Sequence, residues 1–191
     1  MAADAEPQTN SVTDAHAGPS GRERPDVLIL GLGSPIMSDD AVGLHVAREL
    51  RRRIEAHEAD VDEASAGGLR LLDVIQGYHK LIVIDAIQTG EAPPGTLHRV
   101  PLEMKAGTHR LAWQHGMDFH TALRFGQRVG MNVPSVVAIY GVEVHDPYCF
   151  GEHLSPEIEE AVPGIATTIV REAFPHLTGG GQGRGERGHA V

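Results

Sequence analysis

The chain has 191 residues and a formal net charge of −10 at pH 7, a length that suits one α/β domain with a substantial core. No Lys/Arg cluster is flanked by aromatic residues, so no nucleic-acid partner is expected. Cys149 is the single cysteine, which excludes an internal disulfide and a cysteine-built zinc site and agrees with a reducing cytoplasm. No apolar run reaches the roughly 20 residues of a membrane span, and the N-terminus has no apolar signal core. A soluble cytoplasmic protein is therefore predicted, with no membrane partner.

The two ends of the chain differ from its middle in composition. Residues 1–25 are rich in Ala, Asp, Glu, Ser and Pro, and residues 178–191 are rich in Gly. Because neither segment has much to bury, both are predicted to be disordered tails. The folded domain is predicted to span residues 26–177.

The domain begins with a continuous apolar run at residues 27–30, as expected for a strand covered on both faces. After a glycine turn, Ser38, Asp39 and Asp40 are expected to open a helix, because a capping oxygen and acidic side chains suit a helix N-terminus. This helix is expected to bury the apolar side chains that recur at helical spacing: Val42, Val46, Leu50 and Ile54.

The turn after this strand has two functional interpretations. Gly31-Leu32-Gly33 begins a dinucleotide-binding fingerprint, but Ile36 stands where its third glycine belongs, and two carboxylates would repel a pyrophosphate at the helix N-terminus. The second interpretation is a site for a cation, with Asp39 or Asp40 as ligand or acid/base. This stretch alone also leaves open a structural role, in which both acids merely cap the helix.

Further elements alternate between strand and helix along the chain. Buried strands are predicted at residues 81–84 and 136–142, and weaker strands at 60–64 and 96–102, the last at a sheet edge because it contains Pro101. Helices are predicted at 69–75, at 117–129 and from Ser155 onward, with a break or kink at Pro163. Residues 105–114 look irregular. The alternation predicts an α/β fold whose parallel or mostly parallel sheet carries helices on both faces.

Polar residues near the ends of these strands are candidates for a functional site, since the crevice of such a sheet lies beyond the carboxyl ends of its strands. Asp40 follows the first strand, and Asp85 is expected to end the strand at 81–84. His115 precedes a helix and is expected in a loop at the same edge. A carboxylate such as Asp85 is costly there unless it is paired, hydrogen-bonded or ligating, and bracing a neighbouring loop is its alternative role.

Among the other candidate side chains, His120 is expected on the solvent face of its helix, so His115 is preferred. Four further histidines are interpreted as surface or loop residues: His45, His79, His98 and His109. No nucleophile elbow surrounds Ser34 or Ser38, and a lone loop residue such as Cys149 is more often inert. Two acids and a histidine with open positions suit Zn²⁺, Ni²⁺ or a similar cation.

Four segments, in this order, carry a resemblance to a known family. They are GLGSPIMSDDAVG at residues 31–43, LIVIDAI at 81–87, HGMDFHTAL at 115–123 and YGVEVHDPYCFGEHLSPEIEEAVP at 140–163. Together they resemble the hydrogenase maturation endopeptidases of the nickel-iron hydrogenases. The resemblance covers residues 27 to 173, nearly all of the predicted domain.

The resemblance implies a five-stranded α/β sandwich, with helices on both faces of the sheet, and an aspartic-type endopeptidase. It implies a metal site made by an acid after strand one, an acid after strand three and a loop histidine, which correspond to Asp40, Asp85 and His115. The implied substrate is the large-subunit precursor of a nickel-iron hydrogenase, from which a short C-terminal extension is removed once nickel is in place. Nickel is thus expected to come with the substrate, either as a mark of readiness or as a Lewis acid, and no nucleotide is expected.

The chain departs from the family pattern at a few positions. Ser34 stands where the family usually has Asn, Ala41 stands where it has Gly, and residues 63–68 lack the usual Asp-Gly-Gly-Thr. These departures bear on turn geometry and substrate fit, not on the three expected ligands. Two other functions stay open: a non-catalytic nickel-sensing or chaperone-like binder of the same precursor, and a small nucleotide-binding protein. The sequence leaves the oligomeric state open.

Overall fold

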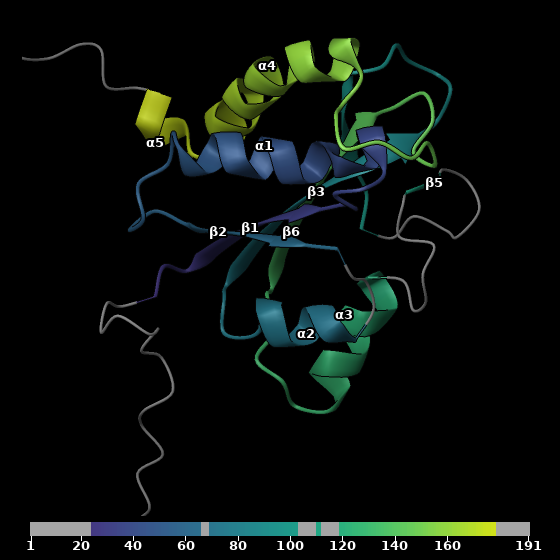
Figure 1. Ribbon diagram of the computed structural model, residues 1–191. Helices are drawn as coiled ribbons and strands as arrows, with labels where there is room; N and C mark the ends of the chain where they lie inside the picture. Colours follow the sequence, from purple (N-terminus) through teal and green to yellow (C-terminus); the bar gives the residue numbers. More distant parts are fainter. Residues whose placement is uncertain (1–23, 66–68, 103–109, 112–118, 179–191) are drawn as a thin grey trace, which may run out of the picture.

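The computed structural model describes residues 24–65, 69–102, 110–111 and 119–178, in which strands and helices alternate (Figure 1). The strands are β1 (Val27–Leu32), β2 (Asp60–Ala64), β3 (Lys80–Gln88), β4 (Leu97–Val100), β5 (Arg110–Leu111) and β6 (Val136–Glu143). A 3-10 helix, η1 (Ser38–Ala41), precedes α1 (Val42–Arg51). The other helices are α2 (Arg70–Ile75), α3 (Phe119–Arg128), α4 (Pro156–Ala173) and α5 (Pro175–Thr178).

The five longer strands form one sheet in the order β2-β1-β3-β6-β4, and the two-residue β5 pairs with β3. Neighbours among β2, β1, β3 and β6 run parallel, whereas β4 is antiparallel to β6 and β5 is antiparallel to β3. The predicted α/β fold, with a mostly parallel five-stranded sheet, is therefore confirmed. β4 is an edge strand, as Pro101 just beyond it predicted.

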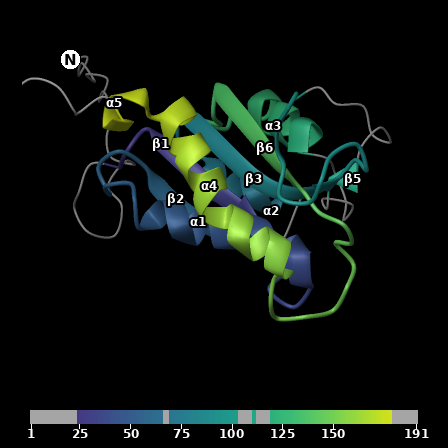
Figure 2. The same cartoon turned by 90° about the horizontal axis from the view of Figure 1, so that it is seen from above.

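Helices cover both faces of the sheet and give three layers. Figures 1 and 2 show α1 and α4 on one face and α2 and α3 on the other. Residues of β3 alternate between the two cores: Ile82 and Ile84 pack in the cluster under α1 and α4, while Leu81 and Val83 pack in the cluster under α2 and α3. Both faces of β3 are thus buried, which is why its sequence is an unbroken apolar run. No helix among the described residues is long and apolar enough to cross a membrane.

A close contact between β1, β3 and α1 fixes where α1 begins. A β carbon at Gly43 would lie 2.2 Å from the carbonyl oxygen of Leu32 and 2.4 Å from that of Ile84. Both obstacles are backbone atoms, so glycine alone allows the first turn of α1 to lie against the two strands. η1, with its two acids, directly precedes α1 and contacts β3.

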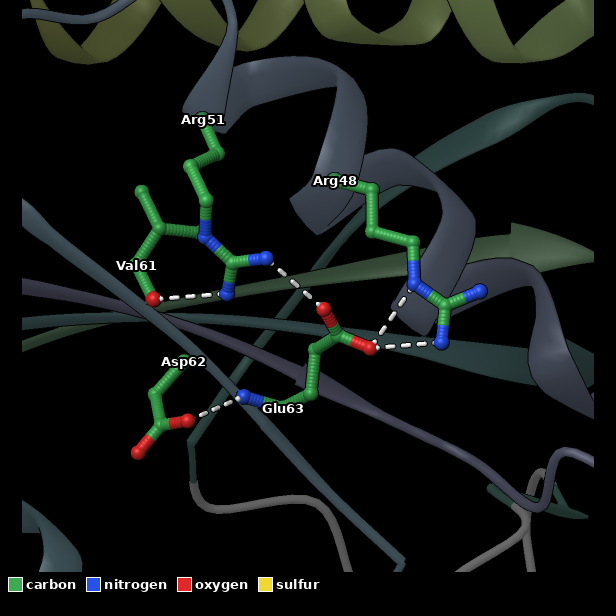
Figure 3. A network of polar contacts seen from close by, with 5 residues as sticks. All are labelled: Arg48, Arg51, Val61, Asp62 and Glu63. Carbon is green, nitrogen blue, oxygen red and sulfur yellow. Dashed lines mark hydrogen bonds and ion pairs between the residues drawn. The ribbon is translucent and has the colours of Figure 1, made fainter.

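Glu63 of β2 ties the edge strand to α1 through two arginines (Figure 3). Its carboxylate accepts hydrogen bonds from Arg48 Nε and Arg51 Nη1, each at 2.9 Å, and Arg51 also donates to the carbonyl oxygen of Val61. Arg51 is half-exposed and paired with Glu63. Because β2 is only partly buried, these polar contacts contribute to its attachment.

Three sequence-based expectations about element ends are wrong. β3 continues past Asp85 to Gln88, because its end pairs with both β6 and β5. Ser38 caps no helix: it lies inside η1 with φ of +28°, and its hydroxyl donates to the carbonyl oxygen of His153. α4 passes through Pro163 without a break, because the burial of Val162 and Ile165 on the same helix outweighs the lost backbone hydrogen bond.

The predicted tails lie almost wholly outside the described residues, with one informative exception. Arg24, placed in the N-terminal tail by composition, stacks on the ring of Tyr78 at 3.7 Å and donates to the carbonyl oxygen of Gln76 at 3.0 Å. Arg24, two residues before the predicted boundary at Asp26, therefore contacts the domain. Most of the stretch predicted to be irregular, 105–114, lies outside the described residues, apart from β5.

Candidate active site

Asp40 lies in η1, where the chain leaves β1 and turns toward α1. The carboxylate of Asp40 is 8% exposed, and its Oδ2 accepts a hydrogen bond from the backbone N–H of Ser34 at 2.7 Å. Gly33, with φ of +145°, makes the turn possible, because a β carbon there would lie 2.0 Å from the backbone oxygen of Asp40. The strand, the glycine turn and η1 together hold this carboxylate at the edge of the sheet.

Asp85 approaches the same place from the neighbouring strand β3. It is 1% exposed, and its Oδ1 accepts a hydrogen bond from the backbone N–H of Ala86 at 2.9 Å. Its Oδ2 is buried and has no hydrogen-bond partner within the described residues. Burial, and secondarily the negative charge of Asp40, raise the pKa of Asp85 well above its usual value. The two acids are therefore close enough to act on each other's ionisation.

The described residues provide this pair of acids and no complete metal site. No group of three or more His, Cys, Asp or Glu side chains that could hold a metal ion occurs in the described ranges. His115 lies outside the described residues, and so does the side chain of its rival His120. The acid pair itself suits a cation, because a positive charge would satisfy the buried Oδ2 of Asp85 and relieve the repulsion between the carboxylates.

Asp39, the other acid of η1, has a different role from that of Asp40. It is 6% exposed, and its Oδ1 accepts a hydrogen bond from the backbone N–H of Ser155 at 2.7 Å. Ser155 is the N-cap of α4, so Asp39 attaches the start of that helix to η1. Of the two acids considered as site residues, Asp40 is thus the one next to Asp85, and Asp39 joins two elements.

Glu143 at the end of β6 is a buried acid that the sequence interpretation missed. Its side chain is 2% exposed and accepts hydrogen bonds from the backbone N–H groups of Thr89 and Gly90, each at 2.8 Å, and from the Thr89 hydroxyl at 2.6 Å. Burial would raise the pKa of Glu143, but these hydrogen bonds and the nearby His98 hold it below its usual value. Glu143 follows an apolar strand just as Asp85 does, and that signal could have found it.

His98, interpreted from sequence as a surface or loop histidine, lies in β4 with its Nε2 3.2 Å from Glu143 Oε2. The interpretation is wrong because β4 pairs antiparallel with β6, which sets His98 beside Gly141, two residues from Glu143. The cluster of Glu143, Thr89, Gly90 and His98 braces the loop after β3. Glu143 thus has the role that was considered as the alternative for Asp85, that of bracing a neighbouring loop.

Fold and site together define a three-layer α/β protein with two buried acids, Asp40 and Asp85, where the negative charge of Asp40 contributes to the raised pKa of Asp85. The family model described as hydrogenase maturation protease matches residues 44–172. That match covers more than half of the chain, and the chain belongs to this family. It is accordingly a hydrolase, an endopeptidase of hydrogenase maturation. The resemblance seen in the sequence is confirmed.

Individual relatives agree with the family match. The hydrogenase expression/formation protein HupD of Thiocapsa roseopersicina is 26% identical over 160 residues, which cover 82% of this chain and 69% of the relative. Two solved structures share the fold. The hydrogenase maturating endopeptidase HybD from E. coli has a TM-score of 0.59 at 22% identity, with 78% of this chain and 93% of the other covered. The nickel-iron hydrogenase maturation protease HycI from Thermococcus kodakarensis has a TM-score of 0.60 at 19% identity, with 76% and 90% covered.

Proposed function

We propose that this endopeptidase removes a C-terminal extension from the nickel-loaded large-subunit precursor of a nickel-iron hydrogenase. Asp40, Asp85 and His115 are the proposed site residues. The observation that carries the proposal is the state of Asp85, a fully buried carboxylate beside a second acid, with one oxygen lacking a hydrogen-bond partner within the described residues. Such an arrangement costs stability in the empty protein, and a cation brought by the substrate would remove that cost.

In this proposal nickel arrives as part of the substrate, and the protein itself contributes ligands and proton transfer. Asp40 of η1 and Asp85 of β3 offer carboxylate oxygens, and His115 would complete a mixed carboxylate and imidazole set, which suits Ni²⁺. The raised pKa of Asp85 also favours its protonated form, which suits it to donate a proton in an aspartic-type hydrolysis. Neither a nucleotide nor a nucleic acid has a part in the proposal.

We also propose that the protein is located in the cytoplasm. Cys149 is exposed and forms no disulfide, so nothing in its cysteine content calls for an oxidising compartment. The maturation of a nickel-bearing precursor would take place in the same compartment.

A precursor-processing assay tests the proposed function. Wild-type protein should shorten a nickel-loaded precursor, which is seen as a mobility shift and as a released peptide by mass spectrometry. Asp40→Asn, Asp85→Asn and His115→Ala should abolish the shift, whereas the control His120→Ala should process normally. In a nickel titration, His115→Ala should weaken binding by roughly tenfold or more.

The same assay separates the proposed enzyme from a nickel-sensing or chaperone-like binder. A binder would retain the nickel-loaded precursor on a column without releasing any peptide. Processing by both Asp variants at the wild-type rate would exclude these acids from the reaction.

A further inference from the structure

Two loops at the carboxyl edge of the sheet are joined through their backbones. One follows β1 and the other follows β6. Met37 and Gly151 form a parallel bridge, in which the Gly151 N–H donates to Ile36 at 3.1 Å and the Ser38 N–H donates to Gly151 at 2.8 Å. We call residues 34–38 and 148–153 together the two-loop rim. Since both loops hold each other by hydrogen bonds, the rim has a defined backbone.

The rim exposes large apolar side chains although its backbone is fixed. Phe150 is 80% exposed, the highest value among the large hydrophobic residues described, and Ile36 is 57% exposed. Ile36 directly precedes Met37, and Phe150 directly precedes Gly151. Since Met37 and Gly151 form the parallel bridge, Ile36 and Phe150 lie on adjacent backbone segments. Tyr148, 44% exposed, lies on the same loop as Phe150. Single exposed apolar residues are ordinary, but neighbouring ones on an ordered rim mark a contact surface.

Residues at or next to the rim donate hydrogen bonds to both acids of η1, of which only Asp40 belongs to the acid pair. Ser34, at the start of the rim, donates its backbone N–H to Asp40, and Ser155, two residues beyond the end of the rim, donates to Asp39. Since residues 34–38 lead directly into Asp40 and Ser34 donates to its carboxylate, a peptide bond bound at Asp40 and Asp85 would lie beside the rim. The side chains that flank this bond would be the first groups to meet Ile36 and Phe150.

We propose that Ile36 and Phe150 form an apolar subsite that binds an apolar side chain of the precursor next to the bond that is cleaved. The inference rests on the proposed function and adds how the substrate is recognised. A second copy of this chain is the less favourable occupant, because the chain carries a net charge of −10 and the loop bearing Phe150 exposes Asp146 and Glu152. The same charges disfavour an acidic peptide at this place.

The test measures kcat and KM of precursor processing for Phe150→Ser, Ile36→Ser and the double variant. Loss of one buried apolar contact should raise KM by roughly tenfold for each single variant, with kcat unchanged. Phe125→Ser is the matched control, because Phe125 is also an exposed phenylalanine, 43% exposed, but lies on α3. It should leave KM unchanged, and Phe150→Leu should restore most of the affinity. Thermal unfolding should show that all variants fold.

The other possible outcomes contradict either the subsite or the proposed function. Unchanged KM in folded variants would overturn the subsite while leaving the proposed function standing. A fall in kcat at constant KM would mean that the rim positions Asp40, which also overturns it. The subsite would also be overturned if sedimentation showed that the wild-type protein is a dimer and that Phe150→Ser is a monomer. If wild type cleaves no precursor, the proposed function fails by itself. Equilibrium binding of the same nickel-loaded precursor to wild type and Phe150→Ser then decides the subsite, with equal affinities overturning it.

Discussion

At the scale of single residues, three buried acids differ in how they affect the stability of the fold. Asp39 and Glu143 accept hydrogen bonds from backbone N–H groups, so their charges stabilise the loops and helix end that they contact. Asp85 is as deeply buried, but one of its oxygens lacks such a donor within the described residues and another acid lies nearby. Its ionised form opposes folding, which is a property of functional sites more often than of structural ones.

Asp85→Asn should leave the metal-free protein as stable as wild type or more stable at neutral pH, because it removes a buried charge while keeping the shape. Since the native pKa of Asp85 is raised, the native state keeps this proton after the unfolded chain has lost it near pH 3.9. The contribution of Asp85 to wild-type stability is thus full below that pH and falls as pH rises through the native pKa. Chemical denaturation at several pH values should show this fall in wild type and not in Asp85→Asn.

Asp39→Asn is the matched control for this experiment. It should lose on the order of 1 kcal/mol, because the charge of Asp39 faces the N-terminus of α4. If Asp85→Asn loses a similar amount, the carboxylate of Asp85 is a structural acceptor and not a group held ready for a cation.

At the scale of elements, the absence of a side chain at Gly43 lets α1 approach the sheet closely. A β carbon at Gly43 would collide with the backbone oxygens of Leu32 in β1 and Ile84 in β3. η1, with Asp40, precedes this contact directly. The packing of α1 on β1 and β3 therefore fixes how far apart the side chains of Asp40 and Asp85 lie.

Gly43→Ala should destabilise the protein by about 1–3 kcal/mol or more, because backbone atoms cannot move aside for the added methyl group. Gly164→Ala is the control: Gly164 lies inside α4, and nothing lies within 4 Å of its β carbon position. That variant should gain about 0.5–1 kcal/mol from the higher helix propensity of Ala. Urea denaturation of both variants measures the two effects. A neutral Gly43→Ala would show that α1 can shift away from the strands.

At the scale of the whole molecule, composition divides the chain into a central domain and two polar ends. The structure moves the first boundary to Arg24, which contacts Tyr78 and Gln76 and lies 3.8 Å from Asp60. These contacts join Arg24 to β2 and to the turn after α2. Arg24 thus belongs with the domain.

Removal of residues 1–23 and 179–191 should leave Tm unchanged, because those segments have few apolar residues to bury. Arg24→Ala in the shortened protein should lower Tm by a few degrees, since a stacked guanidinium contributes roughly 0.5–1 kcal/mol. Differential scanning calorimetry of the full-length, shortened and Arg24→Ala proteins makes the comparison. A lower Tm on truncation alone would show that one of the ends packs on the domain.

The hydrophobic pattern of the sequence predicted the layers and the central strands, because buried parallel strands and amphipathic helices differ in hydrophobic period. The runs at 27–30, 81–84 and 136–142 each became a central strand. The same rule led to Asp40 and Asp85, since residues near the ends of parallel strands gather at one edge. His115, found by the same reasoning, stays a prediction because it lies outside the described residues.

Other features of the protein depend on contacts between distant segments, which no local sequence pattern contains. Whether an acid after a strand is braced or strained depends on donors from distant segments, which Glu143 receives from Thr89 and Gly90 and which Asp85 Oδ2 lacks within the described residues. The continuity of α4 through Pro163 depends on the core beneath it. The contact between the loops bearing Ile36 and Phe150, more than a hundred residues apart in sequence, exists because β1 and β6 both end at the same edge of the sheet. Hydrophobic period is a local property, whereas hydrogen-bond satisfaction and burial belong to the packed chain.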